Sequence, residues 1–370
     1  MNMLKAHLLT TGTEITCGEV VNSNASWLAL RLEQMGVRVF SHLSVRDQRS
    51  EILKALEHLA DSDILVLTGG LGPTSDDITR SVVAEWAGAE LEFDDQVWRQ
   101  LNDSYQQRGL PVREAHKHQC YFPKGSERLA NPVGTAFGFS LKRGQQRVFI
   151  LPGPPRELEG MWNQEVLPRL QPILSQSPKQ WVRWTCIGVP ESEVAELVEP
   201  VVKGHQLEVG YRAQVPYVKV KIFVDPQKDA YLIQKVESAL GQYVISKGDM
   251  DLAVECLSLW KAPVLEIQDE VSGVMLSQRL FEARRALGTS GPELRAVIGS
   301  RADMKQGLRL SAEGETFTIE LLVQGKPFKE TLSLPYKTKL SAERGRRSAA
   351  EWAIWFAVRN LRALAAQAKT

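Results

Sequence analysis

Three glycines and two aspartates stand close together after an apolar segment of the chain. Gly69, Gly70 and Gly72 are followed by Asp76 and Asp77 at the beginning of a predicted helix. Glycine places no side chain between the backbone and a neighbour, so the N–H groups of such a loop can bind an anion such as phosphate. Paired carboxylates at a helix N-terminus complement the helix dipole and can also hold a hard cation such as Mg2+. The two interpretations are compatible.

The glycine loop matches neither of the two familiar phosphate-binding motifs. No Gly-Lys-Ser/Thr follows the glycines, and the spacing is not Gly-x-Gly-x-x-Gly. Glycine-rich turns by themselves more often make a turn than a site. Here, however, Pro73, Thr74 and Thr79 stand at fixed offsets around the aspartates. The combination favours an anion or metal site.

Short apolar runs alternate with amphipathic segments before this loop. The run from Ile64 to Leu67 is rich in branched side chains, as in a strand that is buried on both faces of a parallel sheet. Ser50 is expected to cap a helix. The order strand, helix, strand, helix, strand is typical of a doubly wound sheet. We therefore predict an α/β fold with a mainly parallel sheet, with strands at 6–9, 37–40 and 64–67 and helices at 24–35 and 50–59.

Acidic residues follow two other predicted strands. Glu14 comes shortly after the first strand, and Asp47 comes after the second. In doubly wound sheets, ligands bind beyond the carboxyl ends of the strands. We therefore expect Glu14, Asp47 and the loop from Gly69 to Asp77 to meet at one edge of the sheet. This convergence is the main argument for a site from the residues themselves.

Two later segments also resemble parts of a site. A Pro-Gly turn around Gly153 ends a predicted strand at 147–151, so it is expected to form a further wall of the same crevice. His116, His118 and Cys120 have a spacing that could suggest a metal. No fourth ligand stands nearby, and a hydrophilic loop is the better interpretation.

The length of 370 residues allows two or three domains. The pattern changes after residue 172, where shorter strands and helices predict a small α+β domain. We place the domains at 1–172, 173–249 and 250–370. The third is predicted to end in a long helix at 341–366, with arginines at its solvated end.

The composition excludes several classes of partner. Lys and Arg number 45 against 44 for Asp and Glu, so the net charge of +1 gives no global field that would recruit nucleic acid or membrane. No apolar run approaches the length of a membrane span, and the N-terminus does not read as a signal peptide. The four cysteines are scattered, which favours reduced thiols over disulfides or a zinc cage. We expect a cytoplasmic protein.

Taken together, these motifs resemble the CinA (competence/damage-inducible protein A) family, whose first domain is similar to the molybdopterin-binding fold of molybdenum cofactor biosynthesis proteins. The resemblance covers about the first 250 residues. The motifs that carry it are Thr11–Ile15 with Gly18 and Asn24, Arg46-Asp47, Thr68–Thr79, Asn131–Gly138, Leu151–Gly153 with Glu157, Gly188–Ser192 and Val209–Tyr211.

The resemblance implies a nucleotide-diphosphate hydrolase, typically acting on ADP-ribose with a divalent metal (Mg2+, Co2+ or Mn2+) and K+, and it implies a homodimer. It makes Glu14, Asp47 and Asp77 catalytic, with either Glu14 or Asp47 as the base. It makes Glu14, Asp76 and Asp77 metal ligands. It assigns phosphate or nucleotide contacts to Gly12, Asn24, Gly69, Gly70, Gly72, Thr74, Thr79, Asn131, Gly134, Gly153 and Glu157. The family usually has Pro in place of Phe137, which would reshape that wall of the pocket.

Many family members continue into a nicotinamide mononucleotide deamidase domain with the motif Glu-Ser-Cys-Thr-Gly-Gly. The equivalent stretch here is 269–274, and it places Glu270 where the family has the nucleophilic serine. A carboxylate cannot replace an activated hydroxyl without changing the whole arrangement. We therefore predict that residues 250–370 form a degenerate deamidase-like domain, kept for packing, dimerisation or regulation.

Two other functions stay open. The shared first domain also fits a protein that binds or processes a pterin, with molybdopterin phosphate in the same crevice. The degenerate third domain fits a non-catalytic nucleotide-binding or scaffold protein. Intact acidic and glycine positions in the first domain favour the hydrolase.

Overall fold

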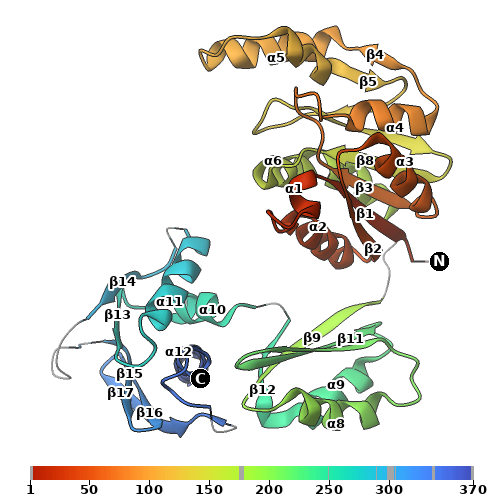
Figure 1. Ribbon diagram of the computed structural model, residues 1–370. Coiled ribbons are helices and arrows are strands. Elements are labelled where there is room, and N and C mark those ends of the chain that lie inside the picture. The colour runs from red at the N-terminus through yellow and green to blue at the C-terminus, as the bar shows by residue number, and fades with distance from the viewer. Residues whose placement is uncertain are drawn as a thin grey trace. The chain divides into compact units, whose positions relative to one another are not determined.

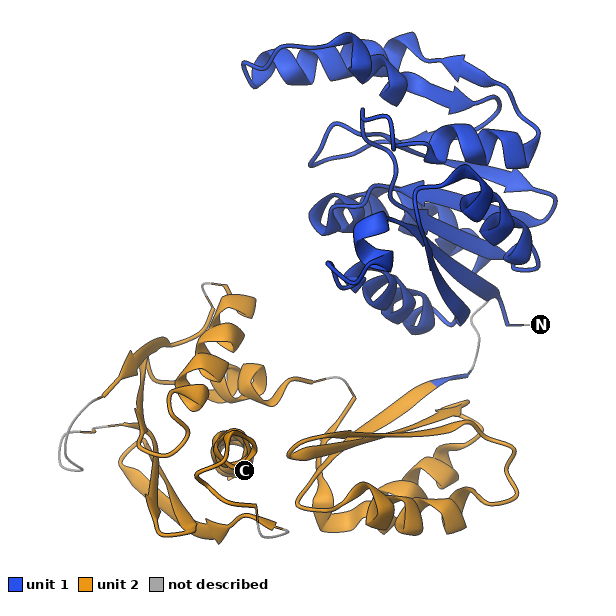
Figure 2. Ribbon diagram, viewed as in Figure 1, with its two compact units in different colours: residues 1–180 blue, residues 181–370 orange. Residues whose placement is uncertain are grey.

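The structure is a computed structural model that describes residues 3–174, 179–248, 250–288, 290–297, 304, 306–335 and 338–367. The chain divides into two compact units, residues 1–180 and 181–370 (Figure 2). The predicted boundary near residue 249 falls inside the second unit, between its two sheets. No described helix has the length and apolar character that a membrane span requires.

The first unit is built on a six-stranded sheet with the strand order β2-β1-β3-β8-β7-β6. Figure 1 labels four of these strands, β2, β1, β3 and β8. The first four strands are parallel, while β7 and β6 pair antiparallel at one edge. The predicted α/β fold with a mainly parallel sheet is therefore confirmed. The strands are β1 (Lys5–Thr11), β2 (Arg38–Val45), β3 (Ile64–Thr68), β6 (Glu127–Leu129), β7 (Gly138–Arg143) and β8 (Gln146–Leu151).

Helices connect these strands and cover both faces of the sheet. Asn22 caps α2, because its side chain accepts a hydrogen bond of 3.0 Å from the N–H of Ala25. The cap predicted at Ser50 is wrong: α3 begins at Arg49, so Gln48 occupies the cap position and Ser50 lies in the first turn. The helices are α1 (Thr13–Thr16), α2 (Ser23–Gln34), α3 (Arg49–His58), α4 (Thr79–Ala87), α5 (Asp95–Gln107), α6 (Pro155–Met161) and α7 (Leu167–Leu170). A small β4 (Leu91–Phe93) and β5 (Tyr121–Pro123) ribbon flanks them.

Alternate residues of the central strands feed two separate cores. On β3, Leu65 and Leu67 pack into the core with α3 and α4, and Val66 packs into the core with α2 and α6. All five residues of β3 are buried, which is why this strand reads as a continuous apolar run. The two cores hold β3 firmly, and the loop after it is positioned accordingly.

The second unit contains two sheets, each with its own core. The four-stranded sheet has the order β10-β11-β9-β12 and packs on α8 (Glu191–Val202) and α9 (Ala230–Leu240). The five-stranded sheet, β14-β13-β15-β16-β17, packs on α10 (Leu252–Leu259), α11 (Met275–Ala286) and α12 (Glu343–Gln367). The strands are β9 (Gln180–Ile187), β10 (Val209–Gln214), β11 (Tyr217–Val224), β12 (Val244–Lys247), β13 (Val264–Asp269), β14 (Glu293–Ala296), β15 (Gly307–Glu313), β16 (Thr316–Val323) and β17 (Lys326–Ser333).

All four cysteines are free thiols, and three of them are buried. Burial raises the pKa of Cys120 to about 11 and the pKa values of Cys186 and Cys256 to about 12. Cys17 is exposed at the C-terminal end of α1.

The turn after β3 requires glycine for two reasons. Gly69 and Gly70 have φ angles of 103° and 64°, in the left-handed region that L residues avoid. In addition, a Cβ atom at Gly69 would overlap the backbone of Thr11, and one at Gly70 would overlap the hydroxyl of Thr79. The backbone therefore passes between β1 and α4 with no room for a side chain.

We expect Gly70→Ala to destabilise the first unit more than Gly88→Ala does. Both glycines have nearly the same φ, 64° and 66°, so both substitutions cost about 1–2 kcal/mol in backbone strain. Nothing lies within 4 Å of a Cβ at Gly88, whereas at Gly70 the overlap with Thr79 adds about 1–3 kcal/mol. Amide hydrogen exchange of β3 measures, for each variant, how far the free energy of opening falls below that of the wild type. Equal losses would show that the turn can accommodate a side chain.

Candidate functional site

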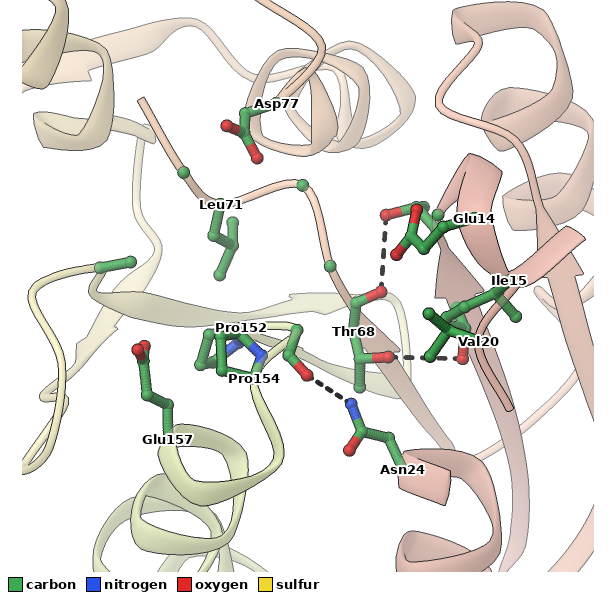
Figure 3. A pocket seen from close by; sticks show the side chains of 18 of the residues that line it. Glu14, Ile15, Val20, Asn24, Thr68, Leu71, Asp77, Pro152, Pro154 and Glu157 are labelled. Carbon is green, nitrogen blue, oxygen red and sulfur yellow. Dashed lines mark hydrogen bonds between the residues drawn. The ribbon is translucent and has the colours of Figure 1, made fainter. Parts of the chain in front are cut away.

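A cavity of about 540 Å3 lies beyond the carboxyl ends of β1, β3 and β8 (Figure 3). The residues that line it come from the loops after β1, β2, β3 and β8, from α1, α2 and α6, and from two further segments that supply Gln119, Thr135 and Ala136. The convergence predicted from the strand ends is therefore found. Of the predicted site residues, those that line the cavity are Gly12, Glu14, Asn24, Asp47, Gly69, Gly70, Gly72, Asp76, Asp77, Gly153 and Glu157.

The floor of the cavity offers free backbone donors. The N–H of Gly69 donates to the carbonyl oxygen of Leu151 over 3.0 Å. Within the described residues, the next three N–H groups, those of Gly70, Leu71 and Gly72, have no acceptor. Buried or half-buried N–H groups are normally paired, so three successive free donors beside a cavity form a nest suited to an anion.

Asp77 and Asp47 are each held by a threonine. Oδ2 of Asp77 accepts hydrogen bonds from the N–H of Thr74, over 2.8 Å, and from its hydroxyl. Oδ2 of Asp47 accepts from the N–H and the hydroxyl of Thr13, over 2.8 and 3.1 Å. Thr74, predicted to bind the ligand, does not line the cavity; it orients the acidic loop instead.

Glu14 differs from these two carboxylates. It lies in α1 and faces the cavity (Figure 3), and its carboxylate accepts no hydrogen bond from the described residues. The Glu14 carboxylate lies beside Gly12, where a Cβ atom would meet Oε1 at 2.8 Å. The oxygens of Glu14 are therefore available to a ligand or to water.

Asn131 and Gly134 lie behind the cavity wall, although both were predicted to contact the ligand. The Asn131 amide donates to Oε2 of Glu157 over 2.7 Å, and its oxygen accepts from the N–H of Gly134 over 2.7 Å. A Cβ at Gly134 would overlap the Glu157 carboxylate. Asn131 and Gly134 therefore position Glu157. Thr135 and Ala136, which follow Gly134 in the chain, line the cavity themselves.

Two more predicted ligand contacts hold the loops together. Asn24 lines the cavity, and its amide donates to the carbonyl oxygen of Gly153 over 2.7 Å (Figure 3). Thr79 is fully buried below Gly70, 3.4 Å from the hydroxyl oxygen of Thr11, and does not reach the cavity. Phe137 packs against the core with α3 and α4, so the wall that it was expected to reshape is formed by other residues.

Several residues at the site escaped the sequence analysis. Arg80 is buried, and its guanidinium donates to the carbonyl oxygens of Leu71, over 2.9 Å, and Phe137, over 3.0 Å. Burial lowers the pKa of Arg80 to about 10, so it stays cationic at neutral pH below the glycine loop. Gln119 also donates to Leu71 and lines the cavity. The stretch expected as a hydrophilic loop is a short 3-10 helix, Glu114–Cys120, with buried side chains.

Threonine hydroxyls complete the floor of the cavity. Thr10, Thr11 and Thr68 end β1 and β3 and line the cavity. The Thr68 hydroxyl lies 3.3 Å from that of Thr10 (Figure 3). The position of these residues as the last of two buried strands was a signal that sequence reasoning could have used.

The carboxylates do not form a preorganised metal cage. Across the part of the chain that the structure describes, no three His, Cys, Asp or Glu side chains come close enough to hold an ion. Glu14, Asp76 and Asp77 therefore share the cavity without sharing one centre. Mg2+ is commonly held by one or two carboxylates together with waters and substrate phosphates, a mode of binding that needs no group of three protein ligands.

The equivalent of the deamidase motif lies after β13. Glu270 accepts hydrogen bonds from Arg309, over 3.1 Å, and from Gln268, over 2.8 Å. Ser272 is fully buried, donates to Asp269 and accepts from the N–H of Leu276 over 2.9 Å. Both side chains thus have structural partners.

Comparison with known proteins places this architecture in a family. Residues 7–172 match a family described as "Probable molybdopterin binding domain". A CinA-like protein of Geobacter sp. (strain M21) is 33% identical over 329 residues, covering 86% of this chain and 75% of that protein. A CinA-like protein of Citrifermentans bemidjiense shows the same identity and coverage. The crystal structure of the protein CinA from Thermoplasma acidophilum, whose function is given as unknown, is 31% identical and covers 46% of this chain and 98% of that chain, with a TM-score of 0.41.

The match to the Geobacter protein extends well beyond the first unit, because it covers 86% of this chain and 75% of that protein at 33% identity. This match and the match over residues 7–172 both support the family that the sequence motifs indicated. The chain belongs to the CinA family.

Proposed function

We propose that the first unit hydrolyses a nucleotide diphosphate such as ADP-ribose. The observation that carries the proposal is the juxtaposition of three free N–H groups, from Gly70 to Gly72, with the carboxylates of Glu14 and Asp77 on one cavity. The N–H groups can bind one phosphate, and a carboxylate can orient water toward phosphorus. The volume of about 540 Å3 lies in the range of small-molecule sites.

The charge of the cavity calls for a cation beside the ligand. Five carboxylates line it, and the buried Arg80 supports the loop from below. A ligand with two phosphates would add further negative charge. Asp76 and Asp77 would hold a divalent ion that arrives with the phosphates, with Glu14 in reach of its waters. Bound there, Mg2+, Co2+ or Mn2+ would neutralise charge on the phosphates, and K+ would add to this.

Among the two candidate bases, the structure favours Glu14. One oxygen of Asp47 is already occupied by Thr13, so Asp47 serves to fix α1 against the end of β2. Glu14 faces the cavity with both oxygens available. In the proposed reaction, a water molecule attacks phosphorus, and Glu14 accepts a proton from this water. A P–O bond of the pyrophosphate breaks, and ADP-ribose yields AMP and ribose 5-phosphate.

A second candidate function is binding of a phosphorylated pterin. It is favoured by the match of residues 7–172 to a family described by molybdopterin binding. The same free N–H groups would hold the pterin phosphate. Tight binding of molybdopterin without nucleotide hydrolysis would support this function over the first, and a non-catalytic binding protein would bind nucleotides without cleaving them.

Glu14→Gln and Asp77→Asn are each expected to lower hydrolysis at least about a hundredfold, because each removes a charge needed in the transition state. Asn at position 77 still accepts a hydrogen bond from Thr74, so the loop should fold. Asp103→Asn, an exposed position on α5 outside the cavity, is the matched control. The assay follows AMP release from ADP-ribose, FAD and NAD with Mg2+, Co2+ or Mn2+, with chelator as a blank. Folded wild-type protein that leaves all three substrates intact with every metal would contradict the proposal.

We also infer that residues 250–370 do not hydrolyse the amide of nicotinamide mononucleotide. Glu270 cannot act as a hydroxyl nucleophile, and the Ser272 oxygen is buried in two hydrogen bonds. We expect no ammonia release from this substrate above the rate without protein. Release of ammonia that is lost in Ser272→Ala would show that the domain is active after all.

Sedimentation of the full chain tests the predicted homodimer.

A further inference from the structure

A second cavity, of about 400 Å3, lies at the opposite end of β8 from the glycine loop. It is lined by the paired ends of β7 and β8, by the turn after β5 and by Arg169 of α7. Nothing in the proposed function uses it. Its four basic side chains are Lys124, Lys142, Arg147 and Arg169.

Two of these cations face each other without compensation. Lys142 and Arg147 are direct partners in the antiparallel register of β7 and β8. Side chains at directly opposite positions lie about 4.5–5.5 Å apart at Cβ, where like charges destabilise the pair. Neither side chain has a carboxylate within ion-pair distance among the described residues, and Arg147 is half-buried. Within the described part of the chain, no ion pair offsets the repulsion between exposed Lys142 and half-buried Arg147.

The other two cations have carboxylate partners. Lys124 pairs with Glu92 over 2.7 Å, and Arg169 pairs with Glu165 over 2.6 Å and with Glu127 over 3.2 Å. Lys142 and Arg147 are thus the cations of this cavity that have no carboxylate partner among the described residues. Next to it, the cavity offers an apolar wall at Phe149, which is 2% exposed.

We propose that this cavity is a second binding site, for a small molecule that bears phosphate groups. One phosphate would bridge Lys142 and Arg147, converting their repulsion into two charge-assisted hydrogen bonds. The buried hydroxyl of Ser140, on the same face as this pair, would donate a third. The volume of about 400 Å3 suits a small ligand rather than a nucleic acid backbone. This site is independent of the glycine loop.

The test uses pyrophosphate as the probe on the full chain, with amide hydrogen exchange to locate where it binds. Pyrophosphate is expected to slow exchange at residues 138–151, an effect separate from any protection at residues 69–79. Lys142→Gln should weaken the affinity measured from the first segment at least about tenfold, and Lys142→Gln with Arg147→Gln should abolish its protection. The control is the double variant Lys54→Gln with Arg99→Gln, which removes the same two charges at exposed positions outside both cavities. This control should leave the protection of residues 138–151 unchanged.

Stability without the probe provides a second, independent readout. Because the substitutions remove a repulsion, the thermal midpoint of Lys142→Gln should equal or exceed that of the wild type, while its gain on adding pyrophosphate should be smaller. Protection at 138–151 that persists in the double variant, or that falls equally in the control, would overturn the proposal. Loss of protection at 69–79 alone would instead bear on the hydrolase proposal.

Discussion

The rest of the site depends on a lack of space at the end of β3. The backbone there passes between Thr11 of β1 and Thr79 of α4, and no side chain fits at Gly69 or Gly70. Because the two cores on either side of the sheet hold β3 in place, the turn cannot move away to make room. The left-handed turn directs the next N–H groups away from the sheet ladder. Among the described residues they then have no acceptor, so they are available to an anion.

Residues around this turn divide into those that face the cavity and those that hold them. Glu14, Asp77 and Glu157 face it, and a second set fixes their loops: Thr74, Thr79, Asn131, Gly134 and Arg80. A short motif contains both kinds, since a loop that presents a carboxylate must also satisfy its own backbone groups. Motif residues that do not reach the ligand can therefore be as necessary as those that do.

Much of the first unit could be predicted from the sequence, because a strand buried on both faces leaves a continuous apolar run and parallel strands direct their ends to one edge. The antiparallel edge was not predictable in the same way: β6 has three residues, too few for a periodic pattern, and its partner β7 is polar at one end. Arg80 and Gln119 were missed for a related reason. Both read as surface residues, and only the packing of α4 and the 3-10 helix beneath the glycine loop buries them. The degree to which carboxylates share a centre also depends on side-chain directions that spacing does not fix.

The distribution of thiols gives the first unit a built-in point of attachment. Buried thiols with raised pKa values react slowly with electrophiles, because the thiolate is the reactive form. Cys17 is exposed and directly follows α1, the helix that carries Glu14. A maleimide dye added to the native chain will therefore attach at one position, three residues from that carboxylate, without any engineered cysteine. Its emission can report occupancy of the neighbouring cavity for any candidate molecule, whether or not that molecule is turned over.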